Sequence, residues 1–130
     1  MIEKIYQEIK EIDKLDKCSI SDAVCKFTEE SGEWIREINK TTGRKIISES
    51  NEQLQANILE EAADTLQNFL LVCGRFDIKI EDLLNEVLKK NIKWESQIEK
   101  RQSIRENSMK KDNNDKVVII ENGKIIGRQG

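Results

Sequence analysis

The chain contains neither histidine nor proline, and it has only six glycines among its 130 residues. The lack of histidine excludes Ser-His-Asp and Cys-His nucleophiles, an imidazole general base, and zinc or di-iron sites that need an imidazole ligand. Any acid–base or metal chemistry must therefore use carboxylates. Because proline and glycine are the usual interruptions of helices, their scarcity favours an all-α protein.

The small number of cysteines and the lack of long apolar runs indicate in which cellular compartment we expect the protein. The three cysteines, Cys18, Cys25 and Cys73, are odd in number and lack CxxC spacing. They indicate free thiols in a reducing compartment, so we expect a cytoplasmic protein. We expect no signal peptide, no membrane span and no membrane partner. The net charge of −3, from 22 basic and 25 acidic residues, is evenly mixed and predicts no nucleic-acid partner.

Apolar residues recur at spacings of three and four in four segments, which predicts four amphipathic helices. We expect them over residues 2–15, from about 19–22 to about 41–43, over 51–73 and over 80–98. Ser19 or Ser21 would cap the second helix, and Gly74 would end the third. The short polar stretch 43–52 is predicted as a connection. Because such loops are short, residues 1–104 are predicted to form an antiparallel four-helix bundle.

The C-terminal part has a different pattern. Residues 105–116 are predicted as a polar linker. In the last segment, 117–130, VVII and KIIG flank Asn122-Gly123, which predicts a small β-hairpin tail. A lone two-stranded hairpin is marginally stable in water, so we expect this one to dock on the bundle or on a second subunit.

Two acidic pairs interrupt the apolar stripes of the second and third predicted helices. In EESGEW, Glu30 and Glu33 lie on the same side as the neighbouring apolar residues, and in EEAADTL, Glu61 and Asp64 do the same. Either pair alone is typical of a solvated helix surface. Two pairs on facing stripes would repel strongly unless a cation held them together. Oxygen ligands without imidazole favour Mg²⁺, with Mn²⁺ as a possible substitute.

These residues resemble a known family. KFTEESGEW, followed by NILEEAADTLQNFLLVCGRFDIKIEDLLNEVLKKNIKW, is similar to the MazG-like all-α nucleoside triphosphate pyrophosphohydrolases, whose signature is E-x-x-E, a spacer and E-x-x-D. The spacer here has 27 residues, 34–60, near the long end of the family's range. The resemblance covers roughly residues 22–100 and does not include the predicted hairpin.

The resemblance implies Mg²⁺-dependent hydrolysis of a nucleoside triphosphate to its monophosphate and pyrophosphate, in nucleotide-pool housecleaning. An acidic site can bind a polyanionic triphosphate only through a cation, which agrees with this chemistry. The implied metal ligands are Glu30, Glu33, Glu61 and Asp64. One of them would orient the attacking water as general base, with a preference for Glu33 and with Glu30 as the second catalytic candidate.

The resemblance also implies contacts with the substrate. Asn91 and Lys93 would bind phosphate, with Arg101 as a further candidate, although a solvated helix flank is an equally good interpretation of the basic residues. Asn68 and Trp34 lie one turn from predicted ligands and would contact the base. Trp34 is also typical of a core residue.

Three alternatives remain open at the level of sequence. A related dUTPase or a phosphoribosyl-ATP pyrophosphohydrolase would use similar carboxylates, but the first is normally a longer chain and the second usually carries a histidine. A non-catalytic helical interaction or oligomerisation module would leave the acids as surface. In each case we expect self-association as a dimer or tetramer, because the third helix carries more apolar surface than one bundle buries.

Overall fold

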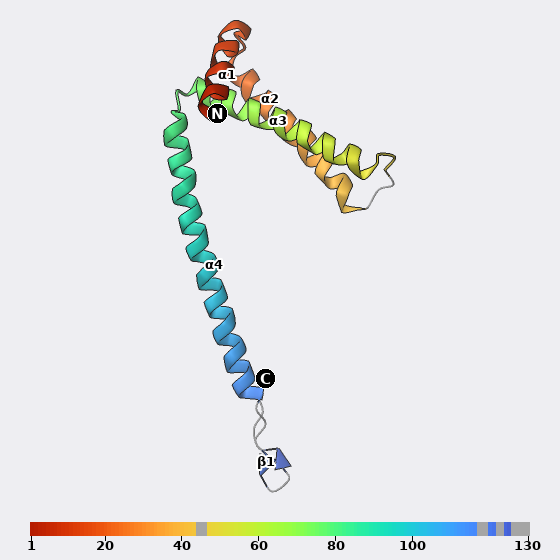
Figure 1. The fold of residues 1–130 in the computed structure, drawn as a ribbon, viewed down its shortest axis with the longest axis vertical. Helices are drawn as coiled ribbons and strands as arrows, with labels where there is room; N and C mark the ends of the chain where they lie inside the picture. Colours follow the sequence, from red (N-terminus) through yellow and green to blue (C-terminus); the bar gives the residue numbers. More distant parts are fainter. Residues whose placement is uncertain (44–46, 117–119, 122–123, 126–130) are drawn as a thin grey trace. The chain divides into compact units, whose positions relative to one another are not determined.

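A computed structural model describes residues 1–43, 47–116, 120–121 and 124–125, with side chains as far as residue 111. The long elements are α-helices: α1 (Ile2–Asp16), α2 (Ile20–Asn39), α3 (Asn51–Arg75) and α4 (Ile80–Lys116). A short 3₁₀ helix, η1 (Lys40–Thr42), follows α2 (Figure 1). The expectation of an all-α protein is confirmed. No helix in the described part of the chain is both long enough and apolar enough to cross a bilayer.

Local side-chain chemistry sets the helix ends. The Ser19 hydroxyl accepts a hydrogen bond from the Asp22 backbone N–H at 3.0 Å, and Ser50 accepts one from Gln53 at 3.2 Å. These bonds satisfy backbone donors that the first turn leaves without partners. Of the two predicted caps of α2, Ser19 and Ser21, the structure therefore has Ser19. After η1, Gly43 adopts a left-handed conformation with φ of 84°, which suits a residue without a Cβ.

Gly74 does not end α3 as predicted, because the helix continues to Arg75 and the left-handed residue of the turn is Asp77, with φ of 52°. Gly74 instead lies where α3 approaches α1. A Cβ built on it would lie 3.0 Å from Lys10 Cγ, closer than ordinary van der Waals contact. The glycine is therefore explained by the close approach of two helices rather than by helix termination.

Residues Met1–Leu83 form one compact unit. Within it, α2 and α3 lie side by side as an antiparallel pair, and α1 packs against α3 (Figure 1). The buried cluster between α1 and α3 consists of Tyr6, Ile9, Leu70 and Cys73. The Tyr6 hydroxyl also donates a 2.5 Å hydrogen bond to the Ile78 carbonyl, which attaches the turn after α3 to α1. These contacts hold α1 against α3, the helix that pairs with α2.

Residues Leu84–Gly130 form a second unit, which contains most of α4. The predicted end of the fourth helix near Ile98 is wrong, because α4 continues to Lys116 and includes the segment predicted as a polar linker. Two-residue strands, β1 (Ile120–Glu121) and β2 (Lys124–Ile125), pair antiparallel. The rest of the predicted hairpin lies outside the described residues, so the hairpin and the packing of four helices into one bundle both stay predictions.

Several large apolar residues of α2 and α3 are exposed. Val24 and Ile35 of α2 are examples, as are Leu59 and Leu66 of α3. The α2–α3 pair buries only a narrow stripe of each helix, since a two-helix contact covers one face of each cylinder. The unit therefore presents apolar surface on both helices.

Candidate metal centre

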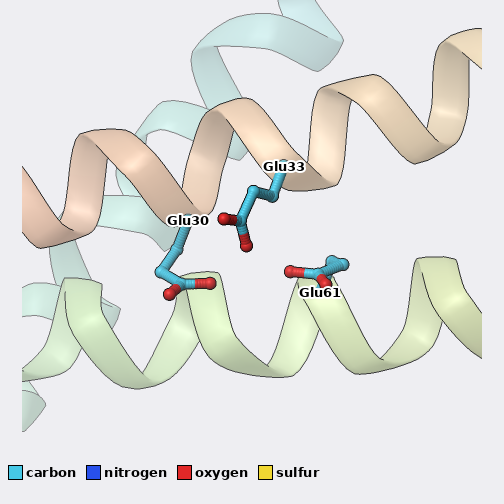
Figure 2. Close-up of side chains that lie close together, drawn as sticks. All are labelled: Glu30, Glu33 and Glu61. Carbon is cyan, nitrogen blue, oxygen red and sulfur yellow. The ribbon is translucent and has the colours of Figure 1, made fainter.

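Three carboxylates meet between α2 and α3. Glu30 and Glu33 come from successive turns of α2, and Glu61 comes from the facing turn of α3. One oxygen of each lies within 4.8 Å of an oxygen of the others. Figure 2 shows the three side chains turned toward one another in the space between the two helices. The spacing of three residues in α2 puts both glutamates on the same side of that helix, which is why they meet the same partner.

Glu30 is the most unusual member of the cluster because it is only 6% exposed. Its Oε1 pairs with the Lys26 ammonium at 2.7 Å, whereas its Oε2 is buried without a hydrogen-bond partner in the protein. Oε2 of Glu61 is buried without a partner as well. An ionised carboxylate that lacks a partner is costly to bury, so these two oxygens indicate a missing donor or cation.

Burial and neighbouring charges shift the pKa of two groups at the cluster, Glu61 and Lys26. Burial raises the pKa of the Glu61 carboxyl above its usual range. The negative charges of the neighbouring carboxylates add to this shift: Glu33, Asp64 and Glu30. The pKa of the Lys26 ammonium is also raised, because Glu30 accepts a hydrogen bond from it and carries a negative charge. Both shifts follow from the negative charge that is gathered between α2 and α3.

One hydroxyl holds the two helices together at this point. Thr65 Oγ1 lies 2.8 Å from the Glu61 carbonyl, in its own helix, and 3.2 Å from the Glu30 carbonyl across the contact. A hydroxyl has a single hydrogen, so the two carbonyls share it. The backbones that carry two of the three carboxylates are thus tied to the same side chain.

The donor set fits a hard divalent cation. It consists only of carboxylate oxygens, which Mg²⁺, Mn²⁺ and Ca²⁺ accept, and it has two buried oxygens without partners. Two ligands on opposite sides of Mg²⁺ lie about 4.2 Å apart, given a ligand distance of about 2.1 Å. At least two of the three pairs of ligands must be adjacent on the ion, at about 3.0 Å, so oxygens within 4.8 Å of one another would need their side chains to move inward on binding. Zinc sites, by contrast, are usually built with sulfur or imidazole ligands.

Asp64, the fourth predicted ligand, is not one of the three carboxylates whose oxygens converge. It is half-buried one turn after Glu61 and contributes negative charge to that residue. Three residues advance a helix by about 300°, so Asp64 lies about 60° around α3 from Glu61, the same offset that separates Glu30 and Glu33 on α2. The role of Asp64 as a metal ligand stays a prediction.

The two predicted base-contacting residues of this unit have different surroundings. The Asn68 side-chain amide donates a 2.8 Å hydrogen bond to the Asp64 carbonyl within α3. Trp34 lines an apolar pocket of about 300 Å³, and its indole Nε1 is buried without a partner. The other pocket residues are Phe27, Ala62, Thr65, Leu66 and Phe69. Trp34 is therefore neither fully core nor a free surface residue.

Asn91, Lys93 and Arg101 all lie on α4, in the second unit, where they are exposed. Their predicted contacts with phosphate stay predictions.

Sequence reasoning missed Lys26, the one residue that forms an ion pair with the carboxylate cluster in the described part of the chain. The signal was a basic residue four positions before Glu30, on the same helix face. Such pairs are frequent on exposed helices, and only the burial of Glu30 gives this one a different meaning. No family model, curated protein or solved structure matches the chain.

Proposed function

We propose that the protein is a Mg²⁺-dependent nucleoside triphosphate pyrophosphohydrolase of the MazG-like type. The observation that supports this most is the convergence of Glu30, Glu33 and Glu61 within 4.8 Å, on facing helices, with two buried oxygens that have no partner. The same three residues are the first three acids of the E-x-x-E and E-x-x-D signature. The reaction would consume one water and convert a nucleoside triphosphate to the monophosphate and pyrophosphate.

In this proposal Glu30, Glu33, Glu61 and Asp64 are the residues that would hold the cation. Bound Mg²⁺ would supply neutralisation of phosphate oxygens, without which an acidic site repels a triphosphate. Because Glu30 and Glu61 each bury an oxygen, they are best suited to ligation. Glu33 is half-buried and has access to solvent, so it is the carboxylate we assign to orienting the attacking water.

Substrate contacts complete the proposal. Asn91 and Lys93, with Arg101, would bind the phosphates, and Asn68 and Trp34 would contact the base. The pocket beside Trp34 supports the second assignment, because its aromatic and aliphatic lining suits a planar ring. A cytoplasmic location and assembly into dimers or tetramers belong to the same proposal.

A second candidate function is a helical interaction module without catalysis. It is favoured by the exposed apolar side chains of the α2–α3 pair, since Leu59 is 72% exposed and Ile35 is 52% exposed. Exposed apolar clusters commonly mark protein interfaces. The same surface would serve a homo-oligomeric enzyme, so the apolar exposure alone does not separate the two candidates.

The deciding experiment is an assay of pyrophosphate release from a broad panel of nucleotides, with Mg²⁺ or Mn²⁺ and the full chain. The panel should include dUTP and phosphoribosyl-ATP, because turnover confined to either would identify the corresponding related activity. We expect release from at least one nucleotide, and loss of it in Glu61→Gln. Glu60→Gln is the matched control, because Glu60 is the adjacent acid but is exposed. A folded wild-type protein inactive on every nucleotide would favour the interaction module.

A further inference from the structure

Lys26 and Glu30 form an ion pair with very unequal burial. The distance from Lys26 Nζ to Glu30 Oε1 is 2.7 Å, and the residues are one turn apart on α2. The Glu30 side chain is 8% exposed, whereas the Lys26 side chain is 54% exposed. An ordinary pair at this spacing has both groups in solvent and contributes little to stability. Here the carboxylate is buried, so the ammonium supplies the partner that burial requires.

The position of the ammonium matters because Glu30 also faces the other carboxylates. Oε1 of Glu30 belongs to the Lys26 pair and Oε2 is buried without a partner, while one oxygen of this carboxylate lies within 4.8 Å of oxygens of Glu33 and Glu61. A divalent cation held by the three glutamates would therefore lie beside a fixed positive charge. Either the ammonium leaves, or the cation binds against its repulsion. Both cases lower the affinity of the site for the cation.

Lys26 has an alternative partner that makes departure feasible. Glu29 follows it by three residues on the same helix and is exposed. Residues three apart on a helix are neighbours, so a rotation of the lysine side chain would bring the ammonium from Glu30 to Glu29. The half-exposed position of Lys26 leaves room for this rotation. No backbone movement is needed.

We propose that Lys26 is a built-in counter-ion of the carboxylate cluster, which competes with a divalent cation for Glu30 and lowers the cation affinity of the site. This inference rests on the metal centre proposed above. Lys26 is a positioning residue in this scheme. It keeps Glu30 paired when no cation is bound, and the cation replaces it. The balance between the two would make occupancy of the site respond to the concentration of free divalent cation.

Direct cation binding to the full chain tests the proposal without any assay of activity. Mn²⁺ affinity is measured from the free-ion signal in electron paramagnetic resonance, and Mg²⁺ affinity by calorimetry. Replacing the charge in Lys26→Met should tighten binding roughly 3- to 10-fold at low salt, because it removes one unit charge a few ångströms from the ion. High salt should shrink the difference.

Two variants control for loss of the side chain and for general charge. Lys26→Arg keeps the positive charge and should bind within about twofold of wild type, because the repulsion is retained. Lys40→Met also removes a lysine that pairs with glutamates, Glu37 and Glu49, but Lys40 lies about 10 Å along the helix axis from Glu33, the nearest residue of the cluster, at about 1.5 Å per residue. It should leave cation affinity unchanged. Circular dichroism verifies that each variant is folded, and Lys26→Gln replaces Lys26→Met if the latter is not.

The outcomes separate this inference from the proposed function. Tighter binding in Lys26→Met, with Lys26→Arg close to wild type, would support it. Equal or weaker binding in Lys26→Met, with wild type binding Mn²⁺, would overturn the role of Lys26 and leave the metal centre standing. If wild type bound neither cation, the metal centre and the inference would both be overturned.

Discussion

Arg75, at the end of α3, holds the Asp13 carboxylate of α1 with two hydrogen bonds, from its Nε and from its Nη2 at 2.8 Å. Both side chains are largely buried. The hydrogen bonds and the positive charge of Arg75 hold the pKa of Asp13 below its usual range. The pair therefore connects two helices through a fork geometry that only arginine provides.

This pair should make stability depend on pH. Because the pKa of Asp13 is lowered by folding, its contribution is present above the unfolded pKa of about 3.9 and is lost as pH falls through the lower folded value. We expect Asp13→Asn to lower the melting temperature by roughly 5 °C at pH 7, and to flatten its fall below about pH 4. Thermal unfolding by circular dichroism across pH 2.5–7 measures both. Asp16→Asn changes an exposed acid of the same helix and should leave the acid slope intact.

Neutralising Glu61 should separate stability from cation binding. In EDTA at neutral pH, Glu61→Gln should unfold at a higher temperature than wild type, because it removes one of three converging negative charges. With millimolar Mg²⁺, wild type should gain stability by mass action and Glu61→Gln should gain little. Differential scanning fluorimetry in both buffers compares the two, with Glu60→Gln as the control. A magnesium shift of equal size in Glu61→Gln would argue against Glu61 as a ligand.

Leu70 should dominate the stability of the first unit because it is 1% exposed and belongs to the cluster that joins α1 to α3. Leu70→Ala should lower the free energy of unfolding by about 2–5 kcal/mol, through lost apolar burial and a residual cavity. Chemical denaturation gives the value. Leu15→Ala removes the same atoms from a side chain that is 81% exposed, and a comparable loss there would contradict the assignment of the core.

The two glycines inside helices should respond differently to alanine. A Cβ at Gly32 meets nothing within 4 Å, so Gly32→Ala should raise the free energy of unfolding by about 0.5–1 kcal/mol through helix propensity. At Gly74, the new methyl group would press on Lys10 at 3.0 Å, and that side chain would have to move. Gly74→Ala should therefore gain less than Gly32→Ala. A larger gain at Gly74 would show that the α1–α3 approach is looser than described.

The sequence predicted the helices well where apolar periodicity and caps agreed, as at Ser19 and across α3. The predicted C-terminal end of α4 was wrong, because apolar periodicity indicates which residues of a helix are buried and does not indicate where the helix ends. No proline or glycine lies between residues 75 and 122, and the polar residues after Ile98 are compatible with a helix, so a solvated helix can continue without an apolar stripe. Gly74 was misinterpreted for a related reason, because only the neighbouring helix explains it.

The carboxylate cluster could be predicted because Glu30 and Glu61 interrupt apolar stripes. Acidic residues on a solvated surface would have no reason to lie on such a stripe. Which of the four acids converge in the cluster could not be predicted. Whether Asp64 joins Glu61 depends on the rotation of α3 about its axis, which spacing alone does not define. The unequal burial of Lys26 and Glu30 depends on how closely α3 covers α2, which becomes visible only in the folded unit.

The shared hydrogen bond of Thr65 limits how the cluster can change size. Since the carbonyls of Glu30 and Glu61 are both tied to this hydroxyl, moving α2 and α3 apart or together would strain one of the two bonds. Side-chain torsions are then the softest adjustment left, and each glutamate has three of them. In the proposed metal centre, the carboxylates could thus follow ions of different radius while the helix spacing stays constant, and discrimination between small and large cations would then come from the free-energy cost of dehydrating the ion rather than from a rigid cage.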